Sequence, residues 1–323
     1  MEQQLTRIAV KIGSNVLTRR DGTLDVTRMS ALVDQVAELH KAGVEIILVS
    51  SGAVASGRSE IHPAKKLDSV DQRQLFSAVG QAKLINRYYE LFREHGIPVG
   101  QVLTMKENFA TRRHYLNQKN CMTVMLENGV IPIVNENDTI SVSELMFTDN
   151  DELSGLIASM MDAQVLIILS NIDGIYNGSP ADPASEVIRE IEHGKDLSSY
   201  IQTSKSSFGR GGMLTKTNIA RKVADEGITV IIANGKRDNI LVDLLHQELP
   251  ALFPDVQSSA LDSQLTYTRF IPAPQPVSSV KKWIAHSEGF AKGELHIDDC
   301  ATKVLASDKA VSILPIGITD VRG

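Results

Sequence analysis

Residues 165–169 read Val-Leu-Ile-Ile-Leu, a run of five apolar residues that ends at Ser170 and Asn171. A strand with one face in water alternates apolar and polar residues, whereas a strand covered on both faces is apolar throughout. Residues 46–49, Ile-Ile-Leu-Val, have the same character. Both runs are typical of buried strands in a mainly parallel sheet that helices cover on both sides.

Four further β-rich runs alternate with helix-period segments over the first 245 residues, which predicts an α/β fold. The first crossover is a clear case, because Met29, Leu32 and Leu39 recur at helical spacing within residues 27–41. Gly43 is expected at the end of this helix. The predicted strands are residues 8–12, 44–49, 99–103, 130–134, 165–169 and 229–233.

The composition is that of a globular chain, since 323 residues with 42% apolar side chains can bury a substantial core. The net charge of −6 is spread without a run of five like charges, which argues against a nucleic-acid or membrane surface. Cys121 and Cys300 have no C-x-x-C spacing, so we expect neither a disulfide framework nor a zinc site. With no signal sequence or long apolar span, we expect a cytoplasmic protein that binds small solutes.

The composition of the chain changes after Pro250, where four prolines and several serines indicate a linker. We therefore predict a catalytic domain over residues 1–253, a linker over 254–277 and a small β-rich segment over 278–323. In that segment we expect strands at residues 281–284 and 293–297, a short helix around 299–306 and a final extended segment at 312–315. A piece of this size is close to the limit of about 40 residues for folding unaided.

Three glycine-bearing segments stand where strands should end: residues 10–14, 49–53 and 208–216. In open α/β sheets, ligands bind beyond the carboxyl ends of the strands, where glycines let backbone N–H groups approach phosphate oxygens. Neither standard phosphate-binding fingerprint is complete. A tight turn before a helix is the alternative for Gly13 and Gly52, whereas three glycines within four positions of the third segment favour a ligand site.

A polar stretch follows the predicted strand at 130–134: residues 135–138 read Asn-Glu-Asn-Asp and residues 149–151 read Asp-Asn-Asp. A metal site, a binding site for a polar small molecule and a solvated hairpin all produce such a pattern. The stretch lacks His and Cys and does not fit the calcium-loop spacing, so we expect no protein-built metal site. The hairpin interpretation is kept for residues 139–148.

Histidine is absent from all of these segments, and no Ser-x-Gly elbow or metal-spaced His pair occurs, which argues against hydrolase and zinc chemistry. Lysines, backbone amides and acids without a general base suit phosphoryl transfer to a carboxylate. That nucleophile is already ionised at neutral pH, with a reference pKa of about 4.3. The difficulty is electrostatic, and each well-placed donor contributes on the order of 3 kcal/mol.

The chain resembles the glutamate 5-kinases of the amino acid kinase superfamily. The resemblance covers residues 1 to about 250 and implies a three-layer α/β/α sandwich around a mainly parallel sheet. The tail resembles the beginning of a PUA domain, so a small, incomplete PUA-like segment is expected there. The matching motifs, in order, are Lys11-Ile12-Gly13-Ser14, Val49-Ser50-Ser51-Gly52-Ala53, Ala78-Val79-Gly80-Gln81, Asn135-Glu136-Asn137-Asp138, Asp149-Asn150-Asp151 and Gly211-Gly212-Met213 with Lys216.

The resemblance implies ATP-dependent phosphorylation of the side-chain carboxylate of L-glutamate to L-glutamyl 5-phosphate, the first step of proline biosynthesis. It further implies Mg²⁺, feedback inhibition by proline, and a homo-oligomer, either a dimer or a tetramer. Two alternatives stay open: another carboxylate kinase acting on acetylglutamate or aspartate, and a non-catalytic amino-acid sensor or RNA-binding protein on the same fold. Asp138 favours a free α-amino group, whereas an acetylated substrate would need an apolar pocket.

The family's site residues transfer to matching positions of this chain. Lys11, Lys216 and Asp151 are the expected catalytic residues, with Asp151 holding both lysines. The expected glutamate site contains Ser51, Gly52, Asn135, Asp138, Asp149 and Asn150. The expected ATP site contains Lys11, Gly13, Ser170, Asn171, Arg210, Gly211, Gly212, Met213, Leu214, Thr215 and Lys216.

This chain departs from the family's pattern in its expected nucleotide site. Arg210 and Leu214 replace the family's usual Thr and small polar residue, and Ser170-Asn171 replaces Thr-Asp, which leaves Asp173 to carry any acidic role there. Asp151 and Ser51 also have a simpler interpretation as helix caps.

Overall fold

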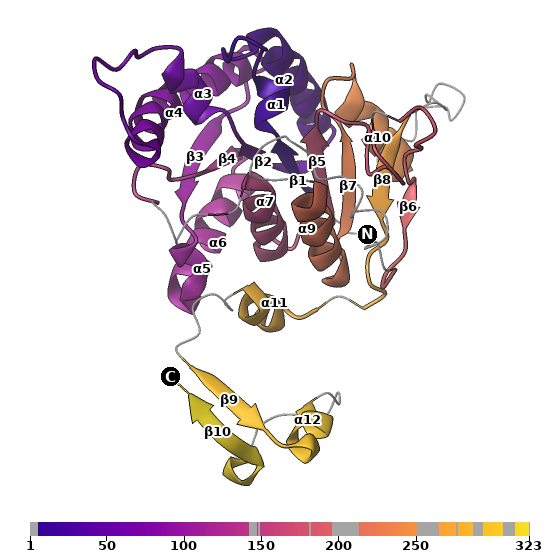
Figure 1. The fold of residues 1–323 in the computed structure, drawn as a ribbon. Coiled ribbons are helices and arrows are strands. Elements are labelled where there is room, and N and C mark those ends of the chain that lie inside the picture. Colours follow the sequence, from indigo (N-terminus) through magenta and orange to yellow (C-terminus); the bar gives the residue numbers. More distant parts are fainter. Residues whose placement is uncertain are drawn as a thin grey trace.

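An eight-stranded sheet crosses the middle of the computed structural model, in the order β3-β4-β2-β1-β5-β7-β8-β6 (Figure 1). The structure describes residues 6–141, 147, 149–180, 182–195, 213–250, 265–275, 277–286, 293–305 and 314–322. Six strands are mutually parallel and confirm the predicted runs to within two residues. They are β1 (Arg7–Ile12), β2 (Glu45–Ser50), β3 (Val99–Thr104), β4 (Ile131–Glu136), β5 (Val165–Ser170) and β7 (Thr229–Asn234).

Helices cover both faces of the sheet, so the predicted three-layer sandwich is confirmed (Figure 1). One layer contains α1 (Ser14–Leu17), α2 (Val26–Lys41), α3 (Ala53–Arg58), α4 (Ser69–Glu94) and α10 (Ile240–Glu248). The other contains α5 (Glu107–Ala110), α6 (Arg112–Glu127), α7 (Asn150–Met160), α9 (Met213–Asp225) and α11 (Ser279–His286).

The apolar strands supply two cores at once, because successive side chains of a strand point to opposite faces. In β5, Ile167 and Leu169 belong to the core under α2, α4 and α10, whereas Leu166 and Ile168 belong to a core under α9. All four side chains are fully buried. This double burial is the physical reason for the unbroken apolar run at residues 165–169.

Two glycines allow α3 and α4 to cross at very short range. A Cβ atom on Gly80 would lie 1.8 Å from the carbonyl oxygen of Ala53, and one on Gly57 would lie 1.8 Å from that of Phe76. No side chain fits at either position. Gly80, which the sequence placed in a family motif, therefore has a packing role that sets the position of α4 against α3.

Two predictions beyond residue 250 were wrong. Residues 281–284 are not a strand but part of α11, where Trp283 Nε1 donates to the Phe109 carbonyl oxygen (3.0 Å) and Lys282 pairs with Asp162 (3.2 Å). These tertiary contacts override a four-residue pattern that has no clear period. Within the predicted linker, Tyr267–Phe270 forms β8, which pairs antiparallel with β7 and parallel with β6 (Glu190–Ile191).

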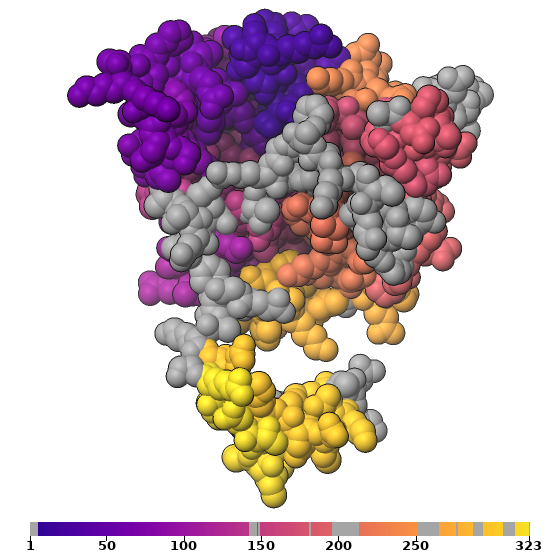
Figure 2. Space-filling model, viewed as in Figure 1, coloured from indigo at the N-terminus to yellow at the C-terminus, as the bar shows by residue number. Residues whose placement is uncertain are grey.

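The last described residues form a small unit apart from the sandwich (Figure 2). Strand β9 (Glu294–Ile297) and α12 (Asp299–Leu305) lie where the sequence predicted them, and β9 pairs with β10 (Ile318–Arg322). A short 3₁₀ turn over Pro315–Gly317 stands at the end of the expected final segment, of which residues 312 and 313 lie outside the described part. The PUA-like assignment stays a prediction. None of the described helices is long and apolar enough to span a membrane.

Candidate functional site

The carboxyl ends of β1, β2, β4 and β5 meet at one edge of the sheet, because these strands are parallel. The predicted glycine segments at Gly13 and Gly52 and the polar residues after β4 lie at this edge. Ligands of open α/β sheets bind there, beside the strand at which the connections change direction. In this sheet that strand is β1, which has β2 on one side and β5 on the other.

Asp151 holds two lysines that come from distant parts of the chain. Its side chain is completely buried and pairs with Nζ of Lys11, in β1, and with Nζ of Lys216, in the first turn of α9, at 2.7 Å. Burial would raise the pKa of Asp151, but the two ammonium groups lower it below its usual value. The carboxylate is therefore ionised at neutral pH and fixes two positive charges next to each other.

Asp149 is the N-cap residue of α7, and its carboxyl group has a different environment from that of Asp151. Its Oδ1 atom accepts hydrogen bonds from the backbone N–H groups of Asp151 (2.9 Å) and Glu152 (3.2 Å), which is an N-cap arrangement. Burial and the neighbouring Asp151 charge raise the pKa of Asp149 to about 6. Its Oδ2 atom is buried and has no hydrogen-bond partner among the described residues. Such an atom fits contact with a ligand donor or a cation.

Amide side chains connect the ends of β2 and β4 to α7. Asn150 Nδ2 lies 2.8 Å from the Ser50 carbonyl oxygen, 2.9 Å from Ser51 Oγ and 3.0 Å from Asn135 Oδ1. Asn135 Nδ2 in turn donates to Gln81 Oε1 of α4 at 2.8 Å. This cluster brings three of the predicted glutamate-site residues together.

Gly52 belongs to the same edge and adopts φ +106°, where a side chain would be strained. It turns the chain sharply from the end of β2 into α3.

Asp138 follows β4 in sequence and is bound to an arginine that our sequence reasoning missed. Arg73 of α4 donates from Nε to Asp138 Oδ1 (2.7 Å) and from Nη2 to Glu136 Oε2 (2.9 Å). The available signal was helical spacing, because Arg73 is in register with Phe76 and Gly80 on the buried face of α4. A charged residue on such a face calls for a buried partner.

The expected nucleotide residues are placed in part. Ser170 is buried at the end of β5, and Gly13 lies so close to that strand that a Cβ atom would be 3.0 Å from the Leu169 carbonyl oxygen. Asp173 accepts hydrogen bonds from Asn234 Nδ2 (3.1 Å) and Arg237 Nε (2.8 Å).

Asn171 is the first residue after β5. Met213, Leu214 and Thr215 occupy the first turn of α9. Leu214 is half exposed. Arg210, Gly211 and Gly212 lie outside the described residues.

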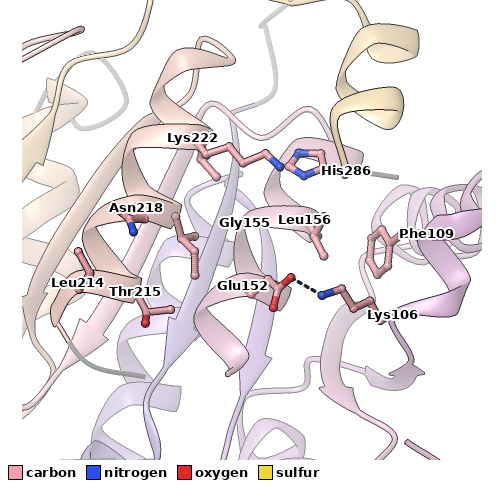
Figure 3. Close-up of a pocket in the computed structure, with 12 residues that line it drawn as sticks. Lys106, Phe109, Glu152, Gly155, Leu156, Leu214, Thr215, Asn218, Lys222 and His286 are labelled. Atoms are coloured by element: carbon pink, nitrogen blue, oxygen red, sulfur yellow. Dashed lines mark ion pairs between the residues drawn. The ribbon is translucent and has the colours of Figure 1, made fainter. Parts of the chain in front are cut away.

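A cavity of about 400 Å³ lies between α5, α7, α9 and α11 (Figure 3). The Lys106–Glu152 ion pair (3.1 Å) stands at one end and Lys222 with His286 at the other. Its lining includes Glu152 and Thr215, the sequence neighbours of Asp151 and Lys216, but neither of those two residues. The cavity therefore borders the Asp151 cluster, and its lining includes Leu214 and Thr215 of the expected nucleotide site.

The model of the amino acid kinase family matches residues 6–234, a range that contains all but a few of the residues described above. Across its whole length the chain is 83% identical to glutamate 5-kinase of Bacteroides thetaiotaomicron and spans 86% of that protein. It is 46% identical to glutamate 5-kinase of Chlorobaculum tepidum, over 98% of this chain and 83% of the relative. The chain belongs to the amino acid kinase family, among the glutamate 5-kinases.

Solved structures agree with this assignment at the level of the fold. The UMP kinase of Ureaplasma parvum superposes with a TM-score of 0.53 at 14% identity, over 83% of this chain and 100% of that one. The isopentenyl phosphate kinase of T. acidophilum superposes with a TM-score of 0.54 at 13% identity, over 82% and 100%. At this identity the similarity shows a shared sandwich and nothing about substrates.

The raised pKa of Asp149 predicts a pH-dependent stability. The folded protein keeps a proton on this carboxyl up to about pH 6, whereas the unfolded chain loses it near 3.8, so stability should fall as the pH rises through this window. Asp149→Asn keeps the capping oxygen without the charge. Between about pH 4 and about pH 7, its free energy of unfolding should gain about 2 kcal/mol relative to the wild type.

Denaturant unfolding at the two pH values measures this difference. Asp68→Asn is the matched control, since Asp68 is also an N-cap aspartate, at the start of α4, but is exposed. It removes the charge of an exposed cap and gives the reference for the effect at the partly buried Asp149. Equal pH dependence of Asp149→Asn and the wild type would contradict the assignment.

Proposed function

We propose that the protein transfers the γ-phosphoryl group of ATP to the side-chain carboxylate of L-glutamate, which forms L-glutamyl 5-phosphate in the first step of proline biosynthesis. The observation that carries this proposal is the buried Asp151 with an ion pair to Lys11 on one side and to Lys216 on the other. The curated relatives at 83% and 46% identity, both named glutamate 5-kinase, support the choice of substrate.

The two lysines answer the main difficulty of the reaction, which is the approach of an anionic carboxylate to an anionic phosphate. Lys11 and Lys216 pair with different carboxylate oxygens of Asp151, and their positive charges would face the transferring group and the bridging oxygen it leaves. Preorganised donors of this kind contribute about 3 kcal/mol each to the transition state. No general base is needed, because the glutamate carboxylate is already ionised at neutral pH.

The glutamate main chain would bind at the ends of β2 and β4. Asp138 accepts the α-ammonium group, while Ser51, Asn135 and Asn150, with the backbone at Gly52, hold the α-carboxylate and orient the side chain toward the lysines. The hydrogen bonds of Asn150 to Ser51 and Asn135 keep these groups in fixed positions before the substrate arrives. Asp149, with its unpartnered Oδ2 atom, would contact the substrate from the start of α7.

ATP would bind beyond β1 and β5. Gly13 gives the phosphates close access to the backbone, and Ser170, Asn171 and the residues from Arg210 to Lys216 surround the nucleotide. Mg²⁺ supplies charge neutralisation between the phosphate oxygens when it is bound. Within the described residues no cluster of three or more His, Cys, Asp or Glu side chains is arranged for a metal, so phosphate oxygens and water would supply most of its ligands.

Further properties follow as proposals from membership in the family. Proline carries the same ammonium and carboxylate groups as the main chain of glutamate, so it would compete at Asp138 and Asn135 as a feedback inhibitor. We also propose a cytoplasmic homo-oligomer, a dimer or a tetramer. The division into a catalytic domain and a C-terminal PUA-like segment belongs to the same set of proposals.

The substrate assignment is tested by the formation of an acyl phosphate, trapped as a hydroxamate, with ATP and one acceptor at a time. We expect turnover with L-glutamate and much weaker turnover with N-acetylglutamate and aspartate. Acetylation removes the ammonium charge that Asp138 would accept, and aspartate is one methylene too short to reach the lysines. A preference for either competitor would overturn the assignment in favour of another carboxylate kinase.

Removal of the α9 lysine tests the mechanism. Lys216→Ala should lower kcat by roughly a hundredfold or more, since one preorganised donor to the transition state is lost, with glutamate binding largely kept. Steady-state kinetics and calorimetric titration with glutamate measure the two effects. Lys222→Ala, on the same helix but directed at the Ala285 carbonyl oxygen (3.0 Å), should keep the wild-type rate. Unchanged turnover in Lys216→Ala would rule out the proposed role.

A further inference from the structure

Arg73 lies between two carboxylates at the main-chain end of the proposed glutamate site. Its Nε atom lies 2.7 Å from Asp138 Oδ1, its Nη2 atom lies 2.5 Å from the same oxygen, and Nη2 also lies 2.9 Å from Glu136 Oε2. Its side chain is 25% exposed, whereas those of Glu136 and Asp138 are 3% and 10% exposed. One guanidinium group therefore forms ion pairs with two nearly buried acids.

Glu136 is fixed independently of any ligand. Its Oε1 atom accepts hydrogen bonds from Ser141 Oγ (3.1 Å) and from the Phe147 backbone N–H (3.0 Å), while Oε2 faces Arg73. Both carboxylate oxygens are thus engaged within the protein. Glu136 serves as an anchor for Arg73 and is a poor candidate for a substrate contact.

Asp138 is held differently. Both contacts from Arg73 fall on Oδ1, and neither uses Oδ2. Burial raises the pKa of Asp138, and Arg73 acts against this rise; burial and the Asp138 charge likewise raise the pKa of Glu136. Without the guanidinium, two like charges would share a buried site, which favours protonation of one of them. Arg73 therefore orients Asp138 and favours its ionised form.

We propose that Arg73 is a positioning residue that sets the selectivity for a free α-ammonium group, by holding Asp138 with one carboxylate oxygen turned to the substrate. This inference rests on the proposed function, because it takes the residues after β4 as the main-chain end of the glutamate site. The arginine is well suited to this task, since a planar guanidinium contacts two carboxylates in one fixed geometry, which a lysine ammonium does not.

The crossing of α3 and α4 fixes the position of the helix that carries Arg73. Gly57 and Gly80 bring α3 and α4 into backbone contact, and Gln81 of α4 binds Asn135 at the end of β4. The helix that carries Arg73 is thereby fixed to α3, which follows β2, and to the end of β4. Arg73 has no contact with Lys11, Asp151 or Lys216 in the described structure, so its effect should be confined to substrate binding.

A pair of ligands tests the proposal. Glutarate is glutamate without the ammonium group, so any effect that acts through Asp138 changes the affinity for glutamate and leaves the affinity for glutarate unchanged. Calorimetric titration of wild-type protein and Arg73→Gln with each ligand gives the four dissociation constants. We expect the constant for glutamate to rise roughly tenfold to a hundredfold, the range for one charge-assisted hydrogen bond, and that for glutarate to change less than about threefold.

Arg87→Gln is the matched control, since Arg87 is on the same helix but forms a half-exposed pair with Glu90 (2.9 Å). It should leave both constants unchanged. Equal losses for glutamate and glutarate in Arg73→Gln would show a general distortion and overturn the proposal, as would unchanged glutamate affinity. If Arg73→Gln does not fold, Arg73→Lys takes its place. The ratio of its dissociation constants for glutamate and glutarate should rise by an intermediate amount relative to the wild type. An unchanged ratio would overturn the proposal.

Binding is measured without turnover, so the two proposals fail separately. Wild-type protein that binds glutamate selectively through Arg73 but does not phosphorylate it would overturn the proposed function alone. Wild-type protein that phosphorylates glutamate, with unchanged selectivity in Arg73→Gln, would overturn the role of Arg73 alone.

Discussion

The ion pairs of Asp151 are the interaction on which the rest of the site depends. A carboxylate with no solvent exposure is stable in its charged form only with nearby compensation, and Lys11 and Lys216 supply it. The same contacts bring β1, α7 and α9 together, although these elements are far apart in the sequence. Under the proposed mechanism, charge compensation in the core and preorganisation for phosphoryl transfer are therefore one arrangement.

The sandwich explains why this arrangement is possible. Strands that are apolar on both faces are buried between two helical layers, so their ends present backbone and side chains at a rigid edge. Lys11 is at the end of one such strand, and Asn135 is at the end of another. Polar groups at the end of a fully buried strand lose little freedom on binding a ligand, because packing has already fixed them.

Sequence reasoning predicted most of the fold, and it placed several candidate-site residues at one edge of the sheet, for a physical reason. Buried parallel strands have a strong apolar signature, and the polar residues that follow them in sequence lie at one edge by topology alone. Lys11 and Asn135 stand near strand ends and could be placed in this way, whereas Asp149 was assigned to the site through the family resemblance. Arg73 could not, because its role depends on how α4 crosses α3, and helix crossing is decided by contacts at Gly57 and Gly80 that are distant from it in sequence.

The two wrong predictions beyond residue 250 have the same origin. The segment around Trp283 is too short to have a diagnostic period, and it becomes helical in contact with α5 and α7. Strand β8 is four residues long and lies next to prolines, which made it look like a linker. In both cases long-range packing decided a structure for which the local signal was weak.

The most direct test of the central claim is the single-turnover rate of phosphoryl transfer in Asp151→Asn, a substitution that keeps the shape of the side chain and removes its charge. If Asp151 fixes Lys11 and Lys216 for the reaction, the rate should fall by roughly a hundredfold or more. Glutamate affinity should be largely kept, because no described contact links Asp151 to Asp138. A folded Asp151→Asn protein with a near wild-type rate would contradict the account.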